Sequence, residues 1–222
     1  MKRFPRIKLA QMMLLFLICG LCTVPLTIKG SPFPPISTTI FVTIASVAAV
    51  FVIGGLRWAA AVAVPSIVAI AILIVDGHDV SLHDRVVPGF LVAFSNVVTA
   101  VCIARAALSR STHGEARIYL GAASYLLIGI SFTMVHQRIA ILDPDAYRVP
   151  GATPEYPIGR WIDYLWFSFS TLTTSGFADV TARSSWARLA CTLEAMTGVM
   201  FPAIFLARMV SAASAEDMTE KP

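Results

Sequence analysis

The sequence predicts an all-α membrane protein with six transmembrane helices. Of its 222 residues, 57% are hydrophobic and only 14% are charged, and the mean hydropathy is +0.76. A bilayer-spanning helix needs ~20 mostly apolar residues, and six stretches qualify: 9–27, 36–53, 58–75, 86–109, 116–136 and 186–212. Each stretch is continuously apolar rather than alternating, which favours helices over a β-barrel. This composition is unlike that of soluble domains, and we expect no enzymatic activity.

The basic residues indicate how the helices are oriented, because positively charged loops stay on the cytoplasmic side of a membrane. Those that fall on one side of a six-helix arrangement are Lys2, Arg3, Arg6, Lys8, Arg57, Arg105, Arg110 and Arg117. We therefore expect a multi-pass protein of the cell inner (plasma) membrane with both termini in the cytoplasm. The net charge of +4 is explained by these helix ends, so the expected partner is membrane lipid and not nucleic acid.

The first apolar stretch begins like a secretory signal peptide, with basic residues before an apolar core. It is long, however, and no convincing cleavage site follows it, which favours a retained first helix. The four cysteines, Cys19, Cys22, Cys102 and Cys191, all lie inside predicted spans. They therefore do not indicate a disulfide framework.

Residues 1–112 are expected to form a four-helix transmembrane bundle that lacks the charges of a voltage sensor. Such a sensor carries Arg or Lys at regular intervals across one helix, because its charge must move through the membrane field. Within 86–109, Arg105 alone interrupts the apolar run, near the expected cytoplasmic end. We therefore expect this bundle to respond only weakly to voltage.

A polar segment between the third and fourth stretches contains candidate metal ligands. These are Asp76, His78, Asp79, His83 and Asp84. Carboxylates and imidazoles this close together could bind a divalent cation or respond to pH. Their spacing matches no diagnostic metal site, so a solvated loop is the simpler interpretation.

Between the last two apolar stretches, residues 166–179 read WFSFSTLTTSGFAD, a short hydroxyl-rich helix followed by a polar loop. This segment resembles the pore unit of the K⁺-channel superfamily, whose loop reads T-T-V-G-Y-G-D or T-T-V-G-F-G-D. The residues that match are Thr173, Thr174, Gly176, Phe177 and Asp179. The stretch 186–212 is similar to the inner helix of bacterial channels of this type, so the resemblance covers roughly 115–212.

The resemblance implies a pore domain at 113–212, with an outer helix, a re-entrant pore helix, a filter loop and an inner helix, followed by a short cytoplasmic tail at 213–222. It also implies a fourfold homotetramer, because one loop supplies a quarter of each ring of oxygens around the ion. The ion expected there is K⁺ or another monovalent cation, with no organic cofactor. The filter residues that it implies are Thr174, Ser175, Gly176, Phe177 and Ala178.

Two of these residues depart from the family pattern. Ser175 stands in place of a β-branched Val, and Ala178 stands in place of a second glycine. If Ala178 adopts the left-handed conformation of that glycine, its Cβ costs roughly 1–2 kcal/mol per subunit. Otherwise the outer part of the loop bends differently and one carbonyl ring is lost. Both departures predict weaker selectivity for K⁺.

Side chains around the loop are expected to support it, namely Trp166, Phe167, Ser170, Thr173, Asp179 and Glu194. The aromatic members could equally form a belt at the membrane interface. Glu194 is a carboxylate in the middle of an apolar stretch, which makes it a functional candidate. We expect it either to be protonated or to hydrogen-bond Ser170 or Thr171.

The inner helix contains a predicted bend. Pro202 lacks the N–H that would bond the carbonyl of Gly198, so the helix is weakened there and could act as a hinge. Gly198 could equally serve close helix packing. The residues expected to line the water-filled cavity and gate are Ala195, Gly198, Val199, Pro202 and Leu206.

The predicted function is passive conduction of monovalent cations, K⁺ above all, by a tetrameric channel. The alternative is a non-conducting membrane sensor or accessory protein that keeps the pore fold, and Ala178 favours this alternative. A secondary transporter is a weaker option, because no paired repeat is evident in the sequence.

Overall fold

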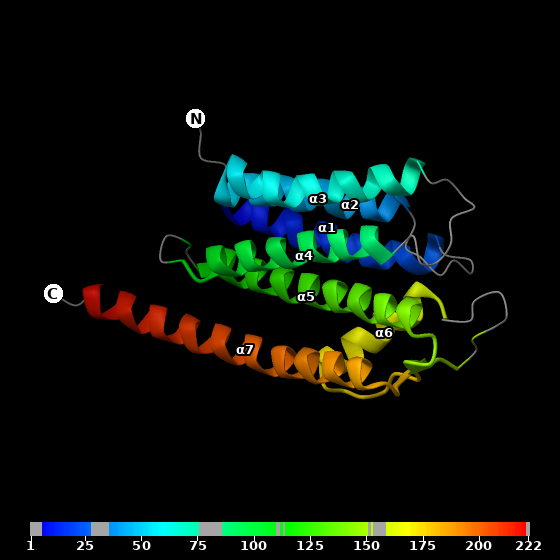
Figure 1. Ribbon diagram of the computed structural model, residues 1–222. Helices are drawn as coiled ribbons and strands as arrows, with labels where there is room; N and C mark the ends of the chain where they lie inside the picture. The colour runs from blue at the N-terminus through cyan, green and yellow to red at the C-terminus, as the bar shows by residue number, and fades with distance from the viewer. Residues whose placement is uncertain are drawn as a thin grey trace.

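The computed structural model describes residues 6–27, 36–75, 86–109, 112, 114–150, 152 and 159–220, and these are mostly helical (Figure 1). The helices are α1 (Arg6–Thr27), α2 (Ile36–Gly54), α3 (Leu56–Val75), α4 (Val86–Ala107), α5 (Gly114–Leu142), α6 (Trp161–Leu172) and α7 (Ser185–Glu220). Two short strands, β1 (Tyr147–Arg148) and β2 (Thr181–Ala182), pair antiparallel. The candidate metal ligands Asp76, His78, Asp79, His83 and Asp84 lie outside the described residues.

Each of the six predicted apolar stretches is occupied by a helix, but two helices are longer than expected. The fifth apolar stretch ends at His136, but α5 continues to Leu142. His136, Gln137 and Arg138 are polar, yet all three are buried against neighbouring elements. α7 also continues to Glu220, through residues that the sequence assigned to a tail.

Three helices in the described part of the chain are long and apolar enough to cross a membrane. They are α4, α5 from Glu115 to Leu142, and α7 from Ser185 to Ser211. The apolar parts of α1, α2 and α3 are shorter. Six membrane crossings therefore stay a prediction.

The chain is arranged around α5 (Figure 1). α1 and α4 pack along α5, α2 and α3 pack on α4, and α6 and α7 pack on α5 on its other side. Small side chains bring these helices close together, including Ala10 of α1, Ala100 of α4 and Ala123 of α5, which share one buried cluster. Close approach through small residues is typical of helices that pack in lipid.

A short connection holds α5 against α4 of the same chain. The hydroxyl of Thr112 donates a hydrogen bond to the Ala106 carbonyl at 2.8 Å, and the Arg117 guanidinium donates to the Ser109 carbonyl at 3.3 Å. Since the connection spans so few residues, α5 must fold back antiparallel to α4. Helix α4 therefore lies directly against the α5 that follows it in sequence.

A second buried cluster joins α6 to the end of α5 and to the two strands. Tyr147 of β1 packs with Tyr164 and Phe167 of α6, and the three aromatic rings meet edge to face. Such ring pairs add to the free energy gained from burial. This cluster fixes the position of α6 relative to α5 and α7.

Candidate pore site

Helix α6 begins with a hydrogen-bonded cap. The backbone N–H of Arg160 donates to the Asp163 carboxylate at 2.8 Å, and the Arg160 guanidinium donates to the same group at 3.0 Å. The hydrogen bond to Asp163 raises the pKa of Arg160 above its usual value. A carboxylate in the first turn also interacts favourably with the helix dipole, so Asp163 stabilises the start of this helix.

At the other end of α6, Ser170 holds the predicted filter loop. Its carbonyl accepts the backbone N–H groups of Ser175 at 2.9 Å and Gly176 at 3.3 Å, and the Ser175 hydroxyl at 3.2 Å. Its own hydroxyl accepts the N–H of Ala178 at 3.2 Å. Thr173 adds a bond between its hydroxyl and that of Ser175 at 3.0 Å. The loop is thereby folded back onto the helix end, with both halves bonded to one residue.

The backbone of this loop is left-handed at two positions. Gly176 has φ of 71°, as the family pattern predicts, and Thr174 has φ of 55°. A β-branched residue in this region is an outlier and carries strain. Ala178 does not have a positive φ, so of the two alternatives the structure has the one in which Ala178 does not copy the family's second glycine. The strain lies at Thr174, because the chain turns immediately after α6 to reach Ser170.

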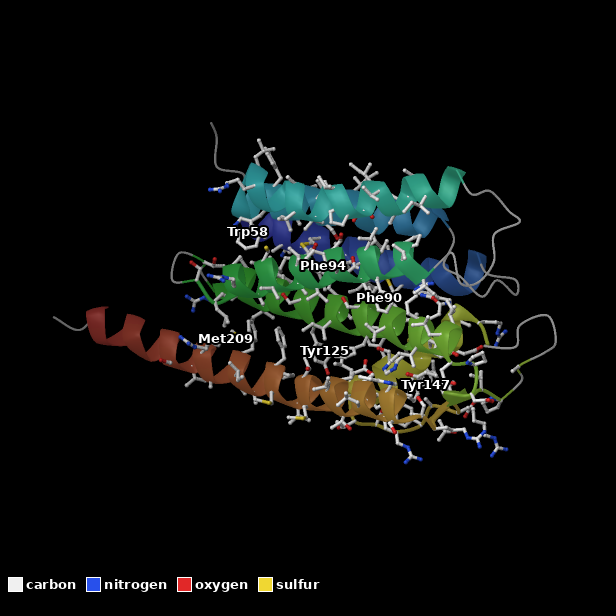
Figure 2. All side chains as sticks on the ribbon, in the orientation of Figure 1. Trp58, Phe90, Phe94, Tyr125, Tyr147 and Met209 are labelled. Atoms are coloured by element: carbon white, nitrogen blue, oxygen red, sulfur yellow. The ribbon has the colours of Figure 1, made fainter. Side chains whose placement is uncertain are left out.

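The last carbonyl of α6 is held by two other helices. The Leu172 carbonyl accepts the hydroxyl of Tyr125 at 3.2 Å, and Tyr125 points from α5 toward α7 (Figure 2). Gly198 of α7 lies so close that a Cβ there would overlap the same carbonyl oxygen. The structure thus shows close packing at Gly198, and a hinge at this position stays a prediction.

We expect Tyr125→Phe to loosen the end of α6. The variant removes one hydrogen bond and leaves the Leu172 carbonyl without its donor, which should lower the free energy of unfolding by about 1–3 kcal/mol. The midpoint of thermal unfolding of the purified protein measures this loss. Tyr119→Phe on the same helix is the control, and equal losses in the two variants would contradict the role of Tyr125.

The aromatic residues expected to support the filter occupy different places. The rings of Trp166 and Phe177 lie 5.8 Å apart, and both residues are exposed in the single chain. Phe167 instead lies in the buried cluster with Tyr147. Asp179 lines a largely apolar cavity of about 610 Å³ together with Trp166 and Arg160. The aromatic side chains therefore divide between the loop and the interior.

Glu194 is fully buried, and its partners are not the ones predicted. It contacts Ser168 through one carboxyl oxygen and His136 through the other, the latter at 2.8 Å. The expected bonds to Ser170 or Thr171 are absent from the described residues, because Ser168 is the hydroxyl residue of α6 that faces α7 at this depth. The network therefore joins α5, α6 and α7 behind the predicted filter loop.

Sequence analysis missed His136 and Tyr147, which extend this network to the strands. His136 Nδ1 lies 2.7 Å from the Tyr147 hydroxyl, and His136 is fully buried. Burial raises the pKa of Tyr147 far above its usual value, so its hydroxyl keeps its proton. A carboxylate in an apolar helix needs a partner. His136, at the end of the apolar stretch 116–136, was the residue in the sequence that could have indicated one.

Of the residues expected to line the gate, Gly198 packs against α6, and the other four are exposed or half-buried on α7. Val199 and Leu206 are 58% and 63% exposed, Pro202 is exposed and Ala195 is half-buried. Only 17% of the apolar part of α7 is buried within the chain, whereas 56% is buried in α4 and in α5. An apolar helix left this bare needs lipid or another protein surface around it.

A short helix, α6, lies between the two long apolar helices α5 and α7, and a polar loop folds back onto its end. A family model described as "Ion channel" matches residues 124–215, which run from α5 through the loop and most of α7. This match supports the resemblance to the K⁺-channel-like pore superfamily that the sequence predicts. Comparison with curated proteins and with solved structures finds no match.

Proposed function

We propose that this chain is one subunit of a homotetrameric channel that conducts monovalent cations passively, with K⁺ the preferred ion. The observation that carries the proposal is the loop from Thr174 to Ala178, held on the C-terminal end of α6 by Ser170 within the matched ion-channel domain. The C-terminal end of a helix carries a partial negative charge that favours a cation. The proposed filter thus receives a favourable field from its own pore helix.

The proposed ion sites are the loop carbonyls and the hydroxyl of Thr174. Filters select ions by replacing the hydration shell with rings of carbonyl oxygens, and one chain supplies part of each ring. Thr173, Thr174, Ser175, Gly176 and Phe177 are all exposed in the single chain. In the proposed tetramer, this exposed loop and the bare part of α7 face the other subunits and the central axis.

We further propose that the tetramer lies in the cell inner membrane with both termini in the cytoplasm. Arg57 and Arg105 lie at the ends of α3 and α4, and Trp58 and Met209 mark the end of the molecule away from Tyr147 (Figure 2). A cytoplasmic location of that end follows the positive-inside rule. Arg148 and Arg183 near the strands are among the basic residues that oppose this orientation.

Purified protein in liposomes, with mass photometry in parallel, tests the proposal. We expect particles of four subunits and K⁺ flux that follows the K⁺ gradient. Fourfold particles without flux would support the non-conducting sensor instead. A monomer or dimer without flux would contradict both the assembly and the conduction.

We expect the double variant Ser175→Val, Ala178→Gly to prefer K⁺ over Na⁺ more strongly than the native loop. The glycine allows the second left-handed turn, and valine ends the side-chain bonds that Ser175 makes to Ser170 and Thr173. A tenfold rise in the ratio of K⁺ to Na⁺ permeability corresponds to a change of ~1.4 kcal/mol in the free-energy difference between the two ions. Reversal potentials in mixed K⁺ and Na⁺ measure it. A native channel that is already as selective would contradict this geometric argument.

A further inference from the structure

The hydroxyl of Ser168 lies between two oxygen acceptors deep inside the protein. One is the Gly129 carbonyl of α5 at 2.8 Å, and the other is a carboxyl oxygen of Glu194. Ser168 and Glu194 are both fully buried. Both contacts have hydrogen-bond geometry, so each needs a hydrogen atom between its two oxygens.

Counting hydrogens shows where the second one must be. A serine hydroxyl carries one hydrogen, a carbonyl carries none, and an ionised carboxylate carries none. Ser168 therefore can donate to only one of its two neighbours at a time. With an ionised Glu194, the other contact would bring two oxygens together without a hydrogen. We propose that Glu194 is held as the neutral carboxylic acid and donates its proton to Ser168, which donates in turn to the Gly129 carbonyl.

The neutral acid makes every hydrogen bond in the network run in one direction. Tyr147 donates to His136 Nδ1, and His136 Nε2 donates to Glu194. Glu194 donates to Ser168, and Ser168 donates to Gly129. Each donor has one acceptor, and the network has no net charge. A continuous chain of this kind is strengthened by mutual polarisation.

The alternative arrangement, an imidazolium paired with a carboxylate, satisfies fewer groups. His136 would then donate from both ring nitrogens, and the Tyr147 hydroxyl would have to accept instead of donate. Its own hydrogen would have no acceptor among the residues that the structure describes. The contact between Ser168 and Gly129 would also lose its hydrogen, and the Gly129 carbonyl would keep only the hydroxyl of Thr133 as a side-chain donor. A buried hydroxyl hydrogen left without an acceptor is costly, so the geometry favours the neutral chain.

Among the residues that the structure describes, few titratable groups lie near Glu194. The titratable groups near it on the packed elements are His136 and Tyr125 of α5, Tyr147 of β1 and Cys191 of α7. The guanidinium of Arg138 points elsewhere, against Gly89 of α4. Of these groups, His136 could carry a positive charge. In the neutral network, its Nε2–H donates to Glu194 without such a charge.

The neutral acid gives Glu194 a positioning role, and this part rests on the proposed function. Through Ser168 it ties the pore helix α6 to α7, and through His136 and Tyr147 it ties both to α5 and β1. The filter loop begins immediately after α6. A shift of α6 would therefore move the carbonyls that are proposed to bind the ion.

Infrared spectroscopy of the full-length protein at neutral pH tests the protonation without requiring conduction. The difference between native protein and Glu194→Gln should show the loss of a carbonyl band of a protonated carboxylic acid. Asp145→Asn, at an exposed acid before β1, should instead lose carboxylate bands. Loss of carboxylate bands in Glu194→Gln would overturn the proposal.

Ser168→Ala and Thr133→Val form a matched pair that tests the positioning role. Both remove a buried hydroxyl that bonds the Gly129 carbonyl, but only Ser168 contacts Glu194. Ser168→Ala should shift the acid band to higher frequency, because the acid proton loses its acceptor, and Thr133→Val should leave it in place. If the acid band of Glu194 stayed in place in Ser168→Ala, the proposed hydrogen bond from Glu194 to Ser168 would be contradicted.

In the conducting channel, we expect Ser168→Ala to lower the K⁺ over Na⁺ permeability ratio by about fivefold, the equivalent of one ordinary hydrogen bond. Thr133→Val should leave the ratio unchanged. Equal ratios in the two variants would overturn the positioning role. If the native protein conducts no ions, the proposed function fails, while the infrared result still decides the state of Glu194.

Discussion

Gly198→Ala should lower the free energy of unfolding more than any other addition of a single methyl group to α7. The new Cβ would overlap the carbonyl oxygen of Leu172, and both atoms belong to the backbones of packed helices. Overpacking of a core costs typically 1–3 kcal/mol and occasionally more. Because no side-chain rotation can relieve this overlap, we expect a cost at or above the top of that range, with α7 moved away from α6.

Gly121→Ala is the matched control for this experiment. It adds the same methyl group to a membrane helix, where it meets the ring of Phe205 instead of backbone. The ring can rotate away, so the loss should be much smaller. Thermal unfolding and mass photometry of both variants measure stability and assembly. Equal losses would show that the contact with Leu172 is not what restricts this position.

The same experiment separates the two interpretations of Gly198. If Gly198 served only as a hinge, alanine would change the opening of the pore and leave the folded state intact. The overlap with Leu172 predicts that the folded state itself is lost or displaced. Pro202, exposed one turn further along α7, would remain the weak point of the helix in either case.

Gly176→Ala should abolish or strongly reduce ion flux while leaving the protein folded. Gly176 has φ of 71°, and there is open space where a Cβ would lie. The substitution therefore adds only the backbone strain of a left-handed residue, about 1–2 kcal/mol per subunit. In the proposed tetramer, four loops would bear this strain at the proposed ion path, so the carbonyls that line this path should turn out of line.

Gly55→Ala carries nearly the same backbone penalty away from the loop. Gly55 lies between α2 and α3 with φ of 77° and also has open space where a Cβ would lie. Flux from liposomes and thermal unfolding, measured for both variants, separate strain in general from strain at the filter. We expect similar stability losses and a flux loss in Gly176→Ala alone. Equal flux in the two variants would contradict the placement of the filter.

The helices and the loop that follows α6 could be predicted because their signals are local in the chain. A run of apolar residues needs no partner to be recognised as a helix, and the pattern around Gly176 lies within a few residues. The end of α5 could not be predicted this way. His136, Gln137 and Arg138 have the polarity of a loop, and only burial against other elements keeps them helical.

The location of the backbone strain and the partners of Glu194 were likewise decided by the tertiary structure. Composition and pattern alone place a carboxylate within an apolar helix and a TTSGF loop before it. Whether that carboxylate meets Ser168 or Ser170 depends on how α6 is rotated against α7. Whether Thr174 or Ala178 is left-handed depends on how the loop reaches Ser170. Both are set by contacts between distant segments, which a one-dimensional pattern does not contain.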